Sequence, residues 1–156
     1  MVTQSLEAVL RTHPFLADLS HEHVQTLISC ASNQRFEKGH YVAREDTEAD
    51  SFYLIRSGTV ALQIHRPESG GLTLNTLGEG DILGWSWLVP PHRWHFDARA
   101  VEPVRAIALD GRCLRTKCEQ DHELGYQLLK RFSTLIEERL EAARLQLLDV
   151  YGVPAR

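Results

Sequence analysis

The side chains best suited to binding chemistry gather in one segment, residues 80–97. All three tryptophans of the chain lie in it, accompanied by an arginine and two histidines: Trp85, Trp87, Trp94, Arg93, His92 and His95. An indole ring stacks on a flat ligand or fills a core, and an arginine or a protonated histidine attracts an anion. Two glycines and two prolines prevent the segment from forming one long regular element. The segment therefore predicts a shaped site, and the alternative interpretation is a hydrophobic plug beneath a loop.

Other chemistries find less support in the sequence. His21 and His23, and likewise His92 and His95, have a spacing that metal ligands use, but the first pair falls at the start of a predicted helix. The chain contains no nucleophile elbow, no phosphate-binding glycine loop of the Walker type and no recognisable pair of catalytic carboxylates. We therefore expect neither a metal site nor an enzyme.

Composition limits the class of protein. The chain has 156 residues, which is the size of one ordinary domain, and a net charge of -4, which argues against a general nucleic-acid binder. Its three cysteines, Cys30, Cys113 and Cys118, form no Cys-x-x-Cys pair, so we expect reduced thiols. No apolar stretch is long enough to span a membrane, and residues 1–11 do not resemble a signal peptide. These features predict a cytoplasmic protein.

The segments flanking residues 80–97 show three kinds of pattern. Apolar residues at helical spacing, with Ser20 as a helix N-cap, predict short helices in the first thirty residues. Short runs of β-forming residues follow, at 35–36, 41–43, 52–55, 59–64, 72–77, 95–100 and 104–109, with turn signals between them. Many short strands with this punctuation predict a β-sandwich or barrel.

The last part of the chain has helical periodicity. Apolar residues recur at a mean spacing of about 3.5 residues, which is typical of coiled coils: Leu129, Phe132, Ile136, Leu140, Ala143, Leu147 and Val150. We expect a long amphipathic helix that ends near residues 151–154. It either packs along its own barrel or forms the seam of a homodimer through residues 124–150, and its length favours the dimer.

Helices, a small barrel and a long helix follow one another in the same order in the cyclic nucleotide-binding domain, and four segments resemble motifs of that family. They are HPFLADLS at 13–20, FEKGHYV at 36–42, DSFYLIRSGTV at 50–60 and LGEGDILG at 77–84. The resemblance spans roughly residues 10–145 and implies a catabolite-activator-like sensor domain. Its fold is mainly β, a double-stranded β-helix (jelly-roll-like) barrel with short N-terminal helices and a long C-terminal helix.

The resemblance divides the chain as a single domain over residues 1–156. N-terminal helices take up 1–33, the barrel 34–111 and the C-terminal helices 112–151, with a phosphate-binding cassette at about 80–97. The chain ends at Arg156 without a helix-turn-helix module. We therefore expect a stand-alone module that does not bind DNA directly.

The resemblance also implies a ligand site, from which this chain departs. In the family, a small helix after a glycine, here Gly84, binds the cyclic phosphate through its backbone N–H groups. A glutamate then accepts the ribose hydroxyl, and an arginine followed by Ser or Thr neutralises the phosphate. Trp85 stands at the glutamate position, and Trp94 and His95 stand at the other two. Arg93 replaces the arginine only if the register shifts by one residue.

Two hypotheses follow. In the first, the domain binds cAMP, cGMP or another small anionic ligand by altered contacts, with Ser86 and the N–H groups after Gly84 at the phosphate. The pocket is then bounded by Gly80, Gly84, Trp85, Ser86, Trp87, Arg93, Trp94 and His95. In the second, the indoles fill the barrel and leave a ligand-free scaffold for protein interaction. The family implies a non-enzymatic regulatory module that signals through its C-terminal helix to a separate effector protein.

Overall fold

The N-terminal part of the chain is helical. The computed structural model describes residues 6–66 and 70–150, of which the first elements are α1 (Leu6–Thr12), the 3-10 helix η1 (Pro14–Leu16) and α2 (His21–Ser29). The Ser20 hydroxyl accepts a hydrogen bond from the His23 N–H at 3.2 Å, which confirms Ser20 as the N-cap of α2.

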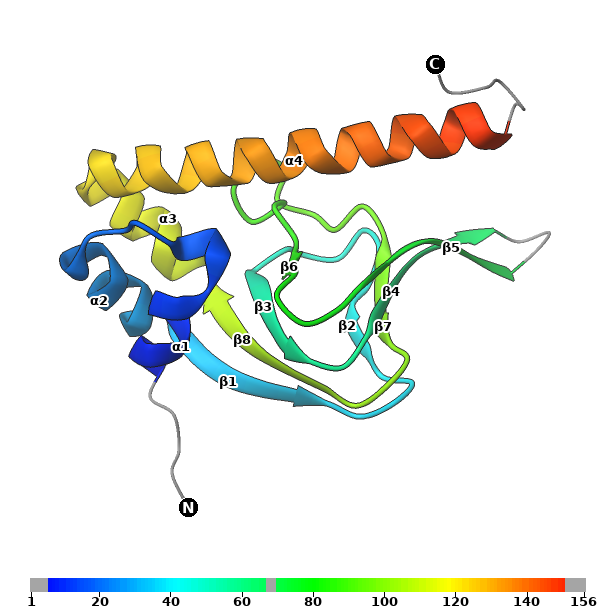
Figure 1. Cartoon of the computed structure of the whole chain (residues 1–156), viewed down its shortest axis with the longest axis horizontal. Coiled ribbons are helices and arrows are strands. Elements are labelled where there is room, and N and C mark those ends of the chain that lie inside the picture. Colours follow the sequence, from blue (N-terminus) through cyan, green and yellow to red (C-terminus); the bar gives the residue numbers. More distant parts are fainter. Residues whose placement is uncertain (1–5, 67–69, 151–156) are drawn as a thin grey trace.

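Two antiparallel four-stranded sheets form the roll (Figure 1). The strands are β1 (Ala31–Phe36), β2 (Tyr41–Ala43), β3 (Ser51–Ser57), β4 (Val60–Arg66), β5 (Gly70–Leu77), β6 (Ile82–Leu83), β7 (Asp97–Ala100) and β8 (Val104–Asp110). Their orders are β1-β8-β3-β6 and β2-β7-β4-β5. This architecture confirms the predicted fold class of a small β-barrel between helical segments.

The two faces of the first sheet pack into two different cores. Alternate side chains of a strand point to opposite faces. Phe52 and Leu54 of β3 therefore join the core shared with the helices, whereas Tyr53 and Ile55 pack in the interior of the roll. The helix-side core and the roll core are the two environments available to the aromatic residues of the site.

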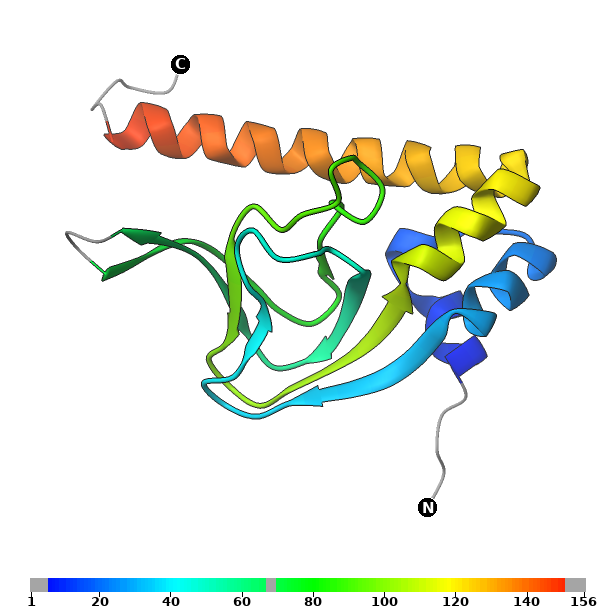
Figure 2. The same cartoon turned by 180° about the vertical axis from the view of Figure 1, so that it is seen from behind.

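Two helices follow the strands, α3 (Gly111–Gln120) and α4 (His122–Val150). The carboxylates of Asp110 and Asp121 cap them by accepting hydrogen bonds from the N–H groups of Cys113 and Leu124, at 3.0 and 3.2 Å. Helix α4 crosses the helical end of the molecule and extends along the roll toward the β4–β5 hairpin, as both views show (Figures 1 and 2).

The apolar residues of α4 lie on two faces of the helix, whereas the sequence analysis predicted a single stripe. Leu124, Leu128 and Phe132 are fully buried in the helix-side core. Leu129 and Leu140 are 53% and 67% exposed. Phe132, which the sequence analysis placed in one stripe with Leu129, belongs to the buried side, because three residues turn about 300° around a helix and so place it about 60° from Leu129 toward Leu128.

The expectation of reduced thiols is wrong for two of the three cysteines. Cys30 and Cys113 form a disulfide across a sequence separation of 83 residues, and Cys118 is free. Strands β1 and β8 pair with Ala31 opposite Leu109, which brings the end of α2 next to the first turn of α3. This neighbourhood arises from long-range strand pairing, so cysteine spacing alone does not reveal it.

Candidate functional site

The cassette connects β6 to β7 without a helix of its own. Residues 84–96 form turns, bends and irregular backbone with an isolated β-bridge between Arg93 and Glu48, and Leu88 N–H donates to the Trp85 carbonyl at 3.1 Å in one of the turns. Within the described part of the chain, no backbone carbonyl accepts a hydrogen bond from the N–H groups of Trp85, Ser86 or Trp87. The cassette thus retains free amides, although it lacks the small helix that the family resemblance implies.

The indole of Trp94 occupies the roll interior beside Gly84. A Cβ atom at Gly84 would lie 2.5 Å from Cη2 and 2.7 Å from Cζ3 of Trp94, and Gly84 has a φ of +97°. Trp94 is 5% exposed, stacks on Tyr53 with ring centroids 6.5 Å apart and contacts Phe96. At the position where the resemblance places a phosphate-binding arginine, this chain therefore has a large apolar side chain packed into the core.

Trp87 lies in the other core and does not line the roll interior, contrary to expectation. It is fully buried, stacks on Phe52 at 5.3 Å and meets the edge of Phe132 of α4 at 5.5 Å. A Cβ at Gly111 would lie 2.8 Å from Trp87 Cβ, so the glycine at the start of α3 permits this close approach. Trp87 therefore joins the cassette to the helices.

Trp85 contacts α4 rather than the roll interior. The Arg139 guanidinium lies over its ring at 5.4 Å from the centroid, within the range of a cation–π interaction. Arg139 also donates from Nη2 to the Ile82 carbonyl. Burial lowers the pKa of Arg139, and the Asp81 and Glu138 carboxylates partly offset that effect. The sequence analysis missed Arg139, since it lies far from the cassette along the chain.

Arg93 and His95 point away from the roll interior, so the register shift proposed for Arg93 does not occur. Both are exposed, and Arg93 Nη1 donates to the Asp46 carbonyl at 2.5 Å. Trp94 N–H donates to the Thr47 carbonyl at 3.0 Å. Neighbouring residues on an extended segment alternate in direction, so Arg93 and His95 point outward where Trp94 points inward.

The predicted site residues therefore separate into distinct environments. Gly84 and Trp94 meet in the roll, and Trp85 packs partly buried beneath Arg139. Ser86 is buried, with 5% of its surface exposed. Gly80 is exposed at the turn before β6, with a φ of +86° and open space around its missing Cβ.

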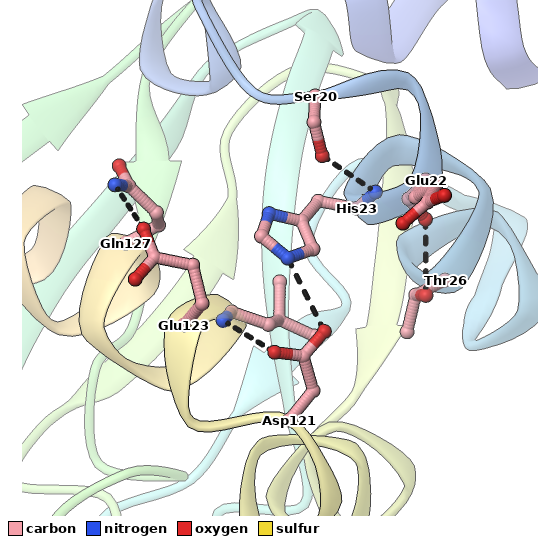
Figure 3. Close-up of polar contacts among 8 residues, drawn as sticks. Ser20, Glu22, His23, Thr26, Asp121, Glu123 and Gln127 are labelled. Carbon is pink, nitrogen blue, oxygen red and sulfur yellow. Dashed lines mark hydrogen bonds and ion pairs between the residues drawn. The ribbon is translucent and has the colours of Figure 1, made fainter.

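Two open clefts lie outside the roll. One of about 720 Å³ runs between η1, the turn at Gly80 and the middle of α4, with Phe15, Asp81 and Arg131 among its lining residues. The other, about 460 Å³, lies between α2 and the start of α4 (Figure 3). In it, His23 Nε2 lies 3.2 Å from Asp121 Oδ2.

Half of the residues that line the second cleft are acidic: Asp18, Glu22, Asp121 and Glu123. The hydrogen bond from the Leu124 N–H is the main reason why the pKa of Asp121 is lowered, and His23 lowers it further.

Among the residues that the structure describes, no group of three or more His, Cys, Asp and Glu side chains is arranged to hold a metal ion. In the same part of the chain, no helix has the length and apolar character needed to cross a bilayer.

Comparison with known proteins identifies the class to which this fold belongs. Residues 33–121 match the family model of the cyclic nucleotide-binding domain, and the chain belongs to that family. It is 28% identical over 123 residues to the CRP-like cAMP-activated global transcriptional regulator of Mycobacterium tuberculosis, covering 78% of this chain and 53% of that protein. It is 27% identical over 127 residues to the anaerobic regulatory protein of Bacillus subtilis, covering 80% of this chain and 53% of that protein.

Solved structures agree on the fold. A protein of Geobacter metallireducens GS-15, described as a cyclic nucleotide-binding protein, superposes with a TM-score of 0.79 at 28% sequence identity, covering 88% of this chain and 99% of that one. The chain spans about half the length of the two curated relatives, 53% in each case.

Proposed function

We propose that this chain is a non-enzymatic regulatory module whose roll is filled by its own Trp94 in place of a cyclic nucleotide. It acts by presenting α4 to protein partners. The observation that carries the proposal is the contact between Trp94 and Gly84. The ring stands 2.5–2.7 Å from where a Cβ at that glycine would be, in the space of the phosphate cassette.

The remaining cassette side chains support this proposal. The family glutamate is replaced by Trp85, which cannot accept a hydrogen bond from a ribose hydroxyl. Within the described residues, the cassette arginine Arg93 faces the Asp46 carbonyl on the outside. A charge-assisted hydrogen bond is worth about 1.5–3 kcal/mol, so the loss of the arginine alone weakens nucleotide binding roughly ten- to a hundredfold.

Output through α4 is supported by the exposed leucines of its outer face. Tyr126, Leu129, Leu140 and Leu147 are more than half exposed, at 53–67%. They continue at coiled-coil spacing with Ile136 and Ala143, so we propose that two copies pair along residues 124–150. A separate effector protein would then read the paired helices.

A second candidate function rests on the free amides of the cassette. The N–H groups of Trp85, Ser86 and Trp87 donate to no backbone carbonyl in the described residues, and unpaired amides attract anions. In this alternative, a small anionic ligand displaces Trp94 from its place beside Gly84, and the domain is a sensor.

Titration with cAMP and cGMP distinguishes the two candidates. All three tryptophans lie in or beside the cassette, so displacement of Trp94 changes the emission spectrum. We expect neither the emission nor the melting temperature of the natural chain to change at millimolar nucleotide. A saturable change in both would contradict the filled-roll proposal and favour the sensor.

A pair of variants tests the cause of that result. Trp85→Glu combined with Trp94→Arg supplies both side chains of the family pattern and removes the ring from the roll. We expect this double variant to gain nucleotide binding. Trp85→Glu combined with Trp94→Gln opens a similar space without the positive charge and serves as the matched control, which we expect to bind at least about tenfold more weakly.

A further inference from the structure

The attachment of α4 to the rest of the molecule changes along its length. Its first three turns are held by Leu124, Leu128 and Phe132, which are fully buried in the helix-side core. After Leu135, which packs only partly against that core, two side-chain hydrogen bonds join α4 to the roll. Arg139 donates to the Ile82 carbonyl, and Gln146 Nε2 donates to the Leu74 carbonyl at 3.3 Å.

Arg139 makes more contacts with the roll side than Gln146 does, because it reaches both ends of the segment from Ile82 to Trp85. Its Nη2 atom bonds the carbonyl of Ile82 in β6, and its guanidinium covers the ring of Trp85 at 5.4 Å. Trp85 also packs against the helix-side core. One side chain thus ties the middle of α4 to the strand and the turn on either side of Gly84.

The burial of Arg139 carries an energetic cost that weakens its contact with the roll. Nη1 of Arg139 is buried without a hydrogen-bond partner, and no carboxylate of the described residues forms an ion pair with the guanidinium. A buried donor without a partner is costly, and a charge removed from water without an ion pair is costly as well. The bonds that Arg139 makes are therefore partly offset by the cost of its burial.

We propose that Arg139, Trp85 and the Ile82 carbonyl form a latch that holds the second half of α4 on the roll without any ligand. Because Trp85 replaces the family's ribose-binding glutamate, the segment that would sense a nucleotide in other members is bonded directly to the output helix here. Opening the latch would loosen α4 beyond Leu135 and would change how its exposed leucine face is presented. The consequence for partners rests on the proposed function, whereas the latch itself does not.

Hydrogen exchange measured by mass spectrometry on the intact chain tests the latch. We expect Arg139→Ala to speed exchange of the α4 amides between residues 133 and 146 about tenfold or more, the effect of losing one hydrogen bond from a charged donor. Arg144→Ala is the matched control. Arg144 is exposed on the same helix and pairs only locally with Glu141 at 3.0 Å, so its loss should leave those rates unchanged.

A double-mutant cycle shows whether Trp85 and Arg139 act as a unit. Trp85→Leu keeps an apolar side chain but removes the π-face, and it should cost far less exchange protection in the Arg139→Ala background than in the natural chain. Arg139→Lys retains a charge and a donor, and we expect it to restore part of the protection.

Two results would overturn the latch. One is equal exchange in Arg139→Ala and Arg144→Ala. The other is a uniform loss of protection that includes β1 and β8, which would make Arg139 a general stabiliser of the fold. Light scattering reports the dimer separately, so failure of the dimer proposal and failure of the latch remain distinguishable.

Discussion

The six-membered ring of Trp94 lies against the backbone of Gly84 with no room for a side chain there. A Cβ atom at Gly84 would come within 2.5 Å of Cη2, which is closer than carbon atoms can approach without displacement. The glycine that begins the cassette therefore serves two purposes in this chain. Its φ of +97° suits the turn, and its missing side chain provides the surface on which the indole packs.

Substitution of this glycine should be unusually costly. Gly84→Ala combines a left-handed backbone with a steric clash, and we expect it to lower the free energy of unfolding by roughly 2–4 kcal/mol in urea denaturation. Gly80→Ala is the control, since Gly80 has a similar φ of +86° but nothing within 4 Å of its missing Cβ. It should cost about 1 kcal/mol, the backbone part alone. Equal losses in the two variants would show that the ring does not crowd Gly84.

Strand alternation in the sequence could have predicted that Trp94 points inward, whereas no sequence pattern predicts where Trp87 points. Ala98 and Ala100 of β7 face the roll core, and Trp94 has the same parity along the extended segment that leads into the strand. Arg93 has the opposite parity, so alternation alone excludes it from the interior. Trp87 lies in a turn with no periodicity, and its burial depends on Phe132 of a distant helix.

Local signals determined most of what could be predicted about the fold. Ser57-Gly58 marks the turn between β3 and β4, where Gly58 has a φ of +92°, and Ser20 marks the start of α2. These residue types act on their immediate neighbours, so they can be interpreted without knowledge of the rest of the chain. The contact between Arg139 and Trp85 joins residues far apart in sequence and therefore needed the structure.

The disulfide predicts that only one thiol is free. Under denaturing, non-reducing conditions, a thiol reagent should detect Cys118 alone and should detect all three cysteines after reduction. Reduction, or the double variant Cys30→Ser with Cys113→Ser, should lower the free energy of unfolding by about 2–4 kcal/mol, because a long loop is no longer closed in the unfolded chain. Cys118→Ser should change neither the titration of the pair nor the response to reduction. Three reactive thiols in the unreduced chain would contradict the bond.

His13 predicts loss of stability in mild acid. Burial lowers its pKa, and the nearby Asp81 carboxylate only partly offsets this effect. The unfolded chain takes up the proton near the usual pKa of about 6.5, while the folded chain resists it to lower pH. Stability is therefore complete above about pH 6.5 and declines as the pH falls from there toward the folded pKa.

Melting temperatures between pH 5 and 8 check this expectation, with the range chosen to bracket the roughly 6.5 of an ordinary histidine. In the natural chain, His13 Nδ1 accepts a hydrogen bond from the Phe15 N–H at 3.2 Å. His13→Asn keeps an acceptor for that N–H but cannot take up the proton, so it should flatten the decline of the melting temperature in acid. His40→Asn changes an exposed histidine and should leave the profile as it is. A profile that His13→Asn does not alter would assign the acid sensitivity to other groups.

The outer face of α4 gives the last prediction, which tests whether two copies of the chain pair. Leu140 belongs to the face that contains Leu129 and Leu147, and it points away from the side of the helix that carries Leu128 and Phe132. Leu140→Glu places a charge in the proposed coiled-coil seam at a position that is 67% exposed in the single chain. It should therefore halve the mass measured by light scattering while leaving the melting temperature of the monomer nearly unchanged.

Leu145→Glu is the matched control, because Leu145 is 49% exposed on the same helix but lies off the repeating face. We expect the Leu145 variant to keep the mass of the natural chain. Leu145 and Leu147 are two residues apart, so they lie about 200° apart around the helix axis and cannot share one seam. A natural chain with the mass of a monomer, or equal masses in the two variants, would show that these leucines serve another partner or none.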